Sequence, residues 1–163
     1  MNTGQIEYAL SVGLAGTRTR FLGVFHSDCL PTPSSYPACL VANTDPKGEP
    51  GTHWVAFYYT SPSSVDFFDP LGLPPLIYSM PTPKLVHSNT YPIQSPTSDA
   101  CGQYCIYFLY HRSRGLSLRS ICTSLEKGGS DRLVNSFLHR LTGSKHLSAT
   151  HLPTHQCARV KPK

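Results

Sequence analysis

The sequence contains no long apolar run, and this absence excludes one large class of membrane proteins. No uncharged apolar stretch reaches the roughly 18 residues that a membrane-spanning helix requires, so we expect no transmembrane segment. Charged residues are also few, at 14% of the 163 residues, against 39% hydrophobic and 10% aromatic residues. A chain with so little charge and so many aromatic side chains is predicted to fold around a packed core, and its length suits one domain.

Paired metal-binding cysteines are also absent. The six cysteines form no CxxC pair, and because no spacing among them is typical of a zinc site, we predict no metal site. They are Cys29, Cys39, Cys101, Cys105, Cys122 and Cys157. We expect free thiols in a reducing compartment. Residues 8–16 weakly resemble the apolar core of a signal peptide. However, the residues before them include the acidic Glu7 and no Lys or Arg, so we predict that the chain is not secreted.

Basic residues are scarce in the first two thirds of the chain and abundant in the last third. Residues 1–110 carry a net charge of −3, whereas residues 111–163 carry +8. Arg112, Arg114 and Arg119 open the basic part, and they are our candidates for contacts with DNA phosphates. The asymmetry is compatible with a bound polyanion such as nucleic acid, and equally with a basic face that is simply solvated.

Proline is concentrated between residues 31 and 96, where 13 of the 15 prolines lie. Proline excludes long helices from this part, and short strands joined by loops are expected. Apolar and aromatic residues between turn signals predict strands at residues 21–25, 38–43, 52–59 and 65–69. Residues 70–93 show no such pattern, and we expect an ordered but irregular connection there.

Helical patterns begin only near residue 98. Residues 101–111 form an apolar, aromatic run without proline, which is long enough for a buried helix capped by Ser98 or Asp99. Residues 118–125 and 133–141 repeat apolar residues at helical spacing and predict two further helices.

The order of these elements predicts the fold class and the domain boundaries. Strands that come first and helices that come last indicate an α+β fold. Ser117 is expected to cap the second helix, Gly128–Gly129 to end it, Ser130 or Asp131 to begin the third, and Gly143 to end that one. We therefore predict a single domain at residues 1–143, followed by a basic, flexible tail at residues 144–163.

Four residues at the ends of the predicted elements supply the groups that a cysteine hydrolase needs. Such an enzyme requires a thiolate, a base beside it, a group that orients the base, and donors for the oxyanion. The candidates are His53, Asp69, Gln94 and Cys101. Considered alone, each also fits a structural role, as a rim histidine, a turn-forming aspartate, a loop glutamine and a small buried thiol.

The predicted positions bring these four residues toward one another. If residues 52–59 and 64–68 pair antiparallel, the start of the first strand lies beside the end of the second, so His53 and Asp69 become neighbours. Cys101 would lie in the first turn of its helix, where unpaired N–H groups and the helix dipole favour a thiolate.

A neighbouring His⁺ would lower the Cys101 pKa further, to about 3.5–7.5. Gln94 lies seven residues upstream of Cys101. Its side-chain amide could donate to an oxyanion together with the Cys101 backbone N–H. Cys39, Cys105 and Cys122 are assigned instead to the apolar core.

Together these segments resemble the adenovirus-type maturation proteases (adenain), which share a fold with the ubiquitin-like-protein proteases. The similarity runs from residue 21 to about residue 109 and consists of FLGVF with ACLVANT, then GTHWVAFYY, then FFDPLG, then a glutamine six residues before CGQYC. The order His, Asp, Gln, Cys is that of the family and is opposite to the order in papain.

The resemblance implies a papain-like or adenain-like α+β fold, in which a small mixed or antiparallel sheet packs on a buried helix that carries the nucleophile. It implies Cys101 as nucleophile, His53 as base, Asp69 as orienting group and Gln94 as oxyanion donor. No cofactor is needed for this chemistry, although the resemblance implies DNA as an activator. The sequence departs from the family in having Asp where the adenovirus enzymes usually have Glu. It also has no cysteine between Asp69 and Gln94, where the adenovirus enzyme bonds an activating peptide.

We therefore predict a cysteine-type endopeptidase that cleaves structural protein precursors of a virus, or of a virus-like transposon, during particle maturation. Its expected location is the virion and the host nucleus. Two alternatives remain open. One is a deconjugating protease for ubiquitin-like modifiers, which would use the same four residues, and the other is a degraded protease that acts as a basic DNA-binding or scaffold protein.

Overall fold

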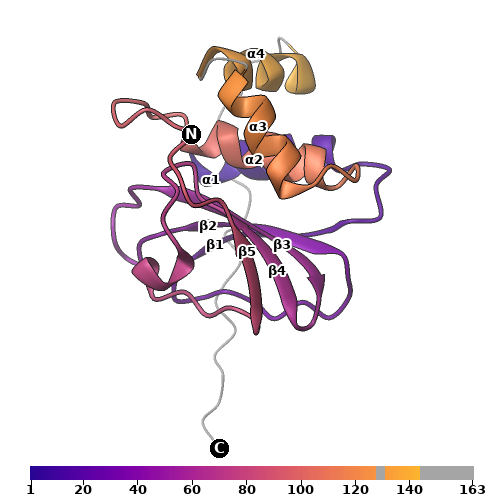
Figure 1. Ribbon diagram of the computed structural model, residues 1–163, viewed down its shortest axis with the longest axis vertical. Coiled ribbons are helices and arrows are strands. Elements are labelled where there is room, and N and C mark those ends of the chain that lie inside the picture. Colours follow the sequence, from indigo (N-terminus) through magenta and orange to yellow (C-terminus); the bar gives the residue numbers. More distant parts are fainter. Residues whose placement is uncertain (128–130, 144–163) are drawn as a thin grey trace, which may run out of the picture.

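A computed structural model describes residues 1–127 and 131–143 of the chain. The strands form a single five-stranded sheet, and the helices α1 to α4 lie together on one face of it (Figure 1). In chain order the elements are α1 (Thr3–Gly13), β1 (Arg20–His26), β2 (Ala38–Asn43), β3 (Trp54–Ser61), β4 (Ser64–Phe68), η1 (Pro75–Tyr78), β5 (Leu85–Ser88), α2 (Cys101–Arg112), α3 (Leu118–Lys127) and α4 (Asp131–Thr142). The predicted α+β class, with a sheet packed on a buried helix, is confirmed.

The sheet is mixed, with the strand order β1-β2-β3-β4-β5. The three central strands pair antiparallel, whereas the edge strands β1 and β5 run parallel to their neighbours. β2 is buried along its whole length, in agreement with its nearly continuous apolar sequence ACLVAN. The four strands predicted from the sequence are all present, and their ends differ from the predicted ones by two residues or fewer.

The segment at residues 70–93 is more regular than the sequence suggested. It contains the short helix η1 and the edge strand β5, so the prediction of an irregular connection is wrong for these two elements. Three of the four β5 residues are exposed, and hence no alternation of apolar and polar residues marks the strand. Its order comes from parallel pairing with β4, in which Val65 lies opposite Val86.

The helix α2 is the centre of the core on the helical face. It packs against β3 and against α1, α3 and α4, and eight of its residues are buried. Its N-cap residue is Ala100 and not Ser98 or Asp99, which corrects the prediction. The Ser98 hydroxyl instead accepts a hydrogen bond from the Ala100 N–H at 3.1 Å.

The apolar segment at residues 8–16 belongs largely to α1, a core helix. The helix is closed at its start by a capping box between Asn2 and Gln5. Its buried residues recur at helical spacing and are Ile6, Ala9, Leu10 and Gly13. The likeness to a signal-peptide core therefore has a different origin, since this segment supplies one face of the interior.

Loops cover the other face of the sheet, where a second apolar cluster forms. Phe57 and Phe67 are its central side chains, and their rings meet edge to face at 4.9 Å. A cavity of about 230 Å³ opens on this side next to Tyr36 and Tyr59. It lies near the end of β3 that is remote from His53.

The helices α3 and α4 confirm the two helices predicted at residues 118–125 and 133–141. Ser117 caps α3 as expected, because its hydroxyl accepts the Ser120 N–H at 3.1 Å. Gly143 follows α4 in a left-handed conformation, with φ of 68°. The predictions for Gly128–Gly129, for Ser130 and for the tail at residues 144–163 lie outside the described residues. Within the described ranges, no helix is long and apolar enough to cross a membrane.

Candidate active site

The β3–β4 hairpin brings His53 and Asp69 together as predicted. The two strands pair antiparallel with Ala56 opposite Phe68, so the residue before β3 and the residue after β4 meet at the same end of the hairpin. The His53 Nε2 atom lies 2.6 Å from Asp69 Oδ1. Both residues are buried, and Asp69 is wholly inaccessible to solvent.

The buried Asp69 carboxylate is fully supplied with hydrogen-bond donors, as a buried charge requires. Its Oδ1 atom accepts from His53 and from the backbone N–H of Leu71 at 2.8 Å. Its Oδ2 atom accepts from the Leu73 N–H at 3.1 Å and from the Tyr78 hydroxyl at 2.7 Å. The turn that follows β4 therefore wraps around the carboxylate and fixes its orientation toward the imidazole.

Asn89 fixes the backbone of Asp69 from the opposite direction. Its Oδ1 atom accepts the Asp69 N–H at 3.0 Å, and its Nδ2 atom donates to the Asp69 carbonyl at 2.6 Å. Neither Asn89 nor Tyr78 was among the residues predicted from the sequence. Both contact Asp69 only because the chain after β4 folds back on itself, and no local sequence pattern predicts this course of the chain.

Cys101 is the first residue of α2, in the helix position that the sequence predicted. Burial alone would raise the pKa of its thiol. The hydrogen bond and charge of His53, together with backbone hydrogen bonds from Trp54 and Gly102, outweigh burial and hold the pKa below its ordinary value of 9.0. Since Asp69 occupies His53 Nε2, the Nδ1 atom is the ring nitrogen left for the thiol.

The imidazole of His53 is held in its protonated form. Burial by itself lowers the pKa of His53, but the hydrogen bonds and charges of Asp69 and Cys101 raise it from 6.5 to about 9. A raised histidine pKa beside a lowered cysteine pKa favours proton transfer from the thiol to the imidazole, which is the direction that a thiolate–imidazolium pair requires. The three groups can therefore supply a nucleophile and a proton donor at the same place.

Gln94 is buried on the loop that leads toward α2. Its backbone N–H and that of Ile93 both donate to the Pro70 carbonyl at 2.9 Å. Its side-chain Nε2 donates to the Ser98 carbonyl at 2.7 Å, which turns the amide nitrogen toward the segment preceding Cys101. Among the described residues, the one hydrogen-bond acceptor of Nε2 is the Ser98 carbonyl, and the buried Oε1 atom has no partner. The amide thus keeps one donor free, as an oxyanion donor needs.

The other described cysteines lack this chemistry. Burial raises the pKa of Cys39 and Cys122 to about 12 and that of Cys105 well above 9.0, in agreement with their assignment to the core. Cys29 is disulfide-bonded, so the expectation of free thiols is wrong for that residue. It holds for Cys39, Cys101, Cys105 and Cys122. Among the described residues, no group of three or more His, Cys, Asp or Glu side chains could hold a metal ion.

The three arginines predicted to contact DNA have different surroundings. Arg112 forms an ion pair with Asp66, with Nε 2.6 Å from Oδ2. The Arg114 guanidinium lies over the Tyr110 ring at 3.6 Å and is exposed, and Arg119 is exposed as well. Arg114 and Arg119 are therefore accessible to a polyanion, whereas Arg112 is engaged within the fold. Contact with DNA stays a prediction for all three.

Comparison with known proteins gives two curated relatives, and no family model matches the chain. A protease of bovine adenovirus C serotype 10 is 32% identical over 92 residues, which is 45% of this chain and 47% of that protein. A protease of bovine adenovirus 2 is 28% identical over 109 residues, which is 56% and 50% of the two chains. The chain spans about half the length of the curated relatives that it matches. The predicted resemblance to adenovirus proteases is confirmed as sequence similarity.

One solved structure shows that the fold occurs elsewhere. The central domain of an uncharacterized Legionella pneumophila protein has a TM-score of 0.51 and 16% identity, over 87% of this chain and 95% of that chain. An ASFV protease has a TM-score of 0.45 and 21% identity, over 64% of this chain and 43% of that chain.

Proposed function

We propose that this chain is a cysteine-type endopeptidase of the adenovirus protease kind. The observation that carries the proposal is the Cys101–His53–Asp69 arrangement, a thiol of lowered pKa beside a histidine of raised pKa that is bonded to a buried carboxylate. Each group alone fits a structural role. Their convergence from a helix start and from the two strands of a hairpin supports a catalytic one.

In the proposed mechanism, the Cys101 thiolate attacks the scissile carbonyl carbon and forms a carbon–sulfur bond. The Gln94 amide and the Cys101 backbone N–H donate to the oxyanion that develops. The His53 imidazolium gives its proton to the leaving amine as the peptide bond breaks, and an acyl-enzyme remains. Neutral His53 then takes a proton from water, which attacks the thioester and regenerates the thiolate. Asp69 holds the imidazole in position throughout.

The substrates that we propose are structural protein precursors of a virus or of a virus-like transposon, cleaved during particle maturation in the virion and the host nucleus. The naming of both curated relatives as adenovirus proteases supports this class. Small residues such as Gly-Gly before the cleaved bond are the pattern that the resemblance to the adenovirus-type proteases implies. Deconjugation of ubiquitin-like modifiers is the alternative, since it needs the same catalytic groups.

A comparison of substrates tests the proposal. The protein is incubated with a Gly-Gly-x peptide library and with ubiquitin-like fusion proteins, each with and without DNA, and products are identified by mass spectrometry. We expect cleavage within the peptides by the native chain and none by Cys101→Ala, which removes only the sulfur. Cleavage confined to the fusions would favour the deconjugating enzyme. Cleavage of neither substrate would leave the degraded scaffold as the better account.

A further inference from the structure

We propose that Tyr78 is a positioning residue for the His53–Asp69 pair, and that its hydroxyl holds the carboxylate so that the other oxygen faces the imidazole. The inference rests on the proposed function, because it assigns Tyr78 a part in the same chemistry. Tyr78 does not touch the reacting atoms, and it acts only through Asp69.

The division of donors between the two carboxylate oxygens supports this role. His53 and the Leu71 N–H occupy Oδ1, whereas the Tyr78 hydroxyl and the Leu73 N–H occupy Oδ2. The Tyr78 bond, at 2.7 Å, is shorter than the Leu73 bond at 3.1 Å. Among the described residues, it is also the one side-chain hydroxyl that donates to this carboxylate. Loss of it leaves Oδ2 with a single long bond, and the carboxylate then has less resistance to rotation.

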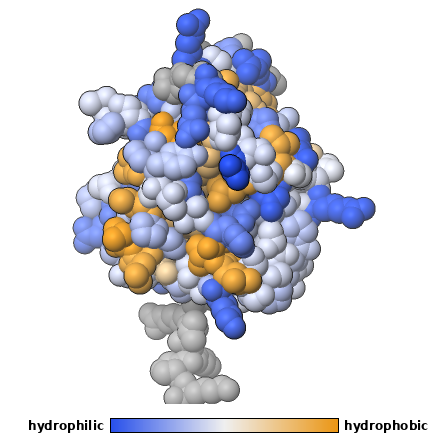
Figure 2. Space-filling model, in the orientation of Figure 1, coloured by the Kyte–Doolittle hydropathy of each residue, from blue (hydrophilic) through white to orange (hydrophobic). Residues whose placement is uncertain are grey.

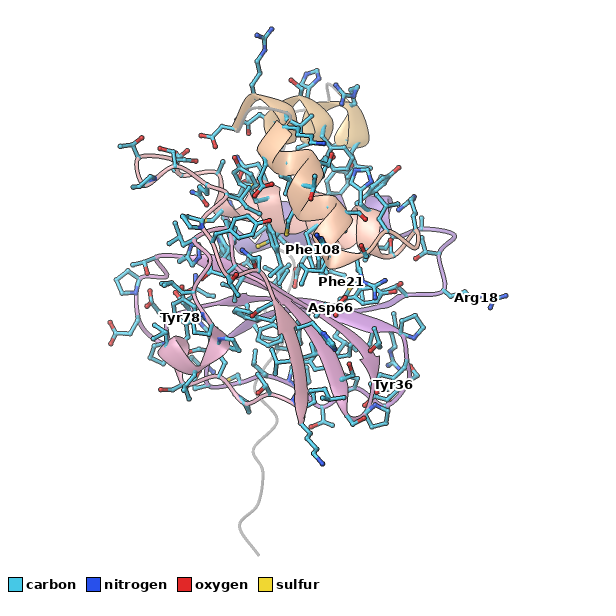
Figure 3. The ribbon with its side chains drawn as sticks, in the orientation of Figure 1. Arg18, Phe21, Tyr36, Asp66, Tyr78 and Phe108 are labelled. Atoms are coloured by element: carbon cyan, nitrogen blue, oxygen red, sulfur yellow. The ribbon has the colours of Figure 1, made fainter. Side chains whose placement is uncertain are left out.

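The placement of Tyr78 on the chain is equally specific. It is the last residue of η1, and the turn ends at Ser79, which adopts a left-handed conformation with φ of 53°. The Tyr78 ring lies beside the His53 ring, with centroids 6.2 Å apart. Figure 3 labels Tyr78 on this turn, at the side of the sheet. One residue thus contacts both members of the pair, through its hydroxyl and its ring.

The hydroxyl remains a donor over the pH range in which the pair operates. Burial, together with the hydrogen bond and the charge of Asp69, raises the pKa of Tyr78 above its ordinary value of 10.0. The titratable groups that face His53 are Asp69, Cys101 and Tyr78 itself. Tyr78 therefore contributes a fixed dipole and no charge of its own.

The neighbours of Tyr78 connect the site with the surface. Leu76 and Ile77, on the same turn, are 83% and 62% exposed, and Figure 2 shows hydrophobic surface in the region of η1. The turn is thus open to solvent on one side and bonded to a wholly buried carboxylate on the other.

Tyr78→Phe tests the proposal, since it removes one oxygen and keeps the ring. We expect kcat for a cleaved peptide to fall about tenfold, because a hydrogen bond to a charged group is lost, with KM changed less than about twofold. NMR titration of the His53 ring should show a pKa below the native value of about 9, because a less restrained Asp69 stabilises the imidazolium less. Tyr36→Phe is the matched control, since the Tyr36 hydroxyl donates to the Pro33 carbonyl outside the site, and it should change neither quantity.

The two readouts separate this proposal from the proposed function. If the native chain cleaves no peptide, the proposed function fails, but the His53 titration still decides the role of Tyr78. An unchanged His53 pKa in Tyr78→Phe overturns the proposal. An upward shift also overturns it, because Tyr78 would then act only by drawing charge from Asp69. Unfolding by urea, compared between Tyr78→Phe and Tyr36→Phe, shows whether a loss of kcat reflects lost stability alone, which would be a third contrary result.

Discussion

Cys101 and Cys105 lie one helical turn apart on α2, and their surroundings give the two thiols opposite properties. Cys101 begins the helix and has His53 as a partner, and its pKa lies below 9.0. Cys105 is fully buried, and its pKa lies well above 9.0. Its thiol donates to the Trp54 carbonyl at 3.3 Å and so acts as a small core side chain. The position of each thiol relative to the helix end and to His53, and not its residue type, sets the direction of its pKa shift and supports Cys101 as the proposed nucleophile.

The two shifted pKa values predict the pH dependence of cleavage. Cys101 must be a thiolate and His53 an imidazolium, so activity should rise as pH passes the lowered Cys101 pKa and fall as it passes about 9, where His53 loses its proton. We expect a bell-shaped profile of kcat/KM, measured with an uncharged peptide. An alkaline limb near the ordinary histidine value of 6.5 would contradict the coupling between His53 and Asp69.

Removal of the Gln94 amide should affect the chemical step more than binding. Gln94→Ala deletes one proposed oxyanion donor. Loss of such a donor typically costs about 10²–10³ in kcat, while KM should change little because the donor would act mainly in the transition state. Steady-state kinetics on one peptide measures both constants. Gln94→Glu is a matched variant, because it keeps the shape but places an oxygen where Nε2 now donates to Ser98, and it should be equally impaired. A loss smaller than about tenfold would identify Gln94 as a loop residue only.

Three of the four catalytic candidates could be found from the sequence because His53, Asp69 and Cys101 each lie at the end of a predictable element. Gln94 lies on a loop, and its spacing from Cys101 and the family resemblance indicated it. The antiparallel hairpin alone makes His53 and Asp69 neighbours. The start of an apolar helix alone gives Cys101 its place. Tyr78 and Asn89 could not be found in this way. Tyr78 ends η1 and Asn89 follows β5, and their contacts with Asp69 depend on how the chain after β4 folds back toward that residue.

At the scale of elements, the loop after β4 and the loop after β5 pack against each other through backbone atoms. Gly72 has φ of 74°, and a Cβ atom there would lie 2.3 Å from the Tyr91 carbonyl carbon. The same contact region includes the hydrogen bonds from Ile93 and Gln94 to Pro70. The packing of Gly72 therefore helps to set the position of the Gln94 side chain.

Gly72→Ala should accordingly lower the free energy of unfolding by more than the left-handed backbone conformation alone would. The left-handed conformation costs a non-glycine residue about 1–2 kcal/mol, and displacement of the Tyr91 backbone adds to this. Gly16→Ala is the control, because Gly16 has φ of 75° but open space around its Cβ position. Urea unfolding should show a larger loss of stability for Gly72→Ala than for Gly16→Ala. Equal losses would show that the two loops do not hold each other in place.

The helix α1 and the strand β5 were not predicted, and they differ in how clearly the sequence indicates them. The helical spacing of Ile6, Ala9 and Leu10, and the capping pair Asn2 and Gln5, were present in the sequence and could have identified α1. β5 offers no such pattern, because its exposed side chains do not alternate and its hydrogen bonds come from β4. Local signals therefore define the helices and the strands β1 to β4, whereas the edge strand β5 depends on tertiary pairing with β4.

At the scale of the whole molecule, the charge is divided along the chain, with −3 before residue 111 and +8 after it. Part of the positive charge is neutralised within the fold, because Arg112 forms an ion pair with the largely buried Asp66. Removal of Arg112 would leave that carboxylate unpaired and would destabilise the fold. Arg114 and Arg119 are exposed, and they are the better positions at which to test binding of a polyanion.

We predict that duplex DNA binds this basic part without sequence preference and raises the rate of peptide cleavage. Each phosphate contact contributes about −0.9 to the slope of log K against log salt, so the paired variant Arg114→Ala with Arg119→Ala should flatten that slope by about 1–2. Arg18→Ala, which removes an exposed charge from the acidic part, should leave it unchanged. Fluorescence anisotropy with a labelled duplex at several salt concentrations measures the slope, and a parallel assay measures cleavage. No binding at low salt, with equal cleavage in the presence and absence of DNA, would mean that the basic residues form only a solvated face.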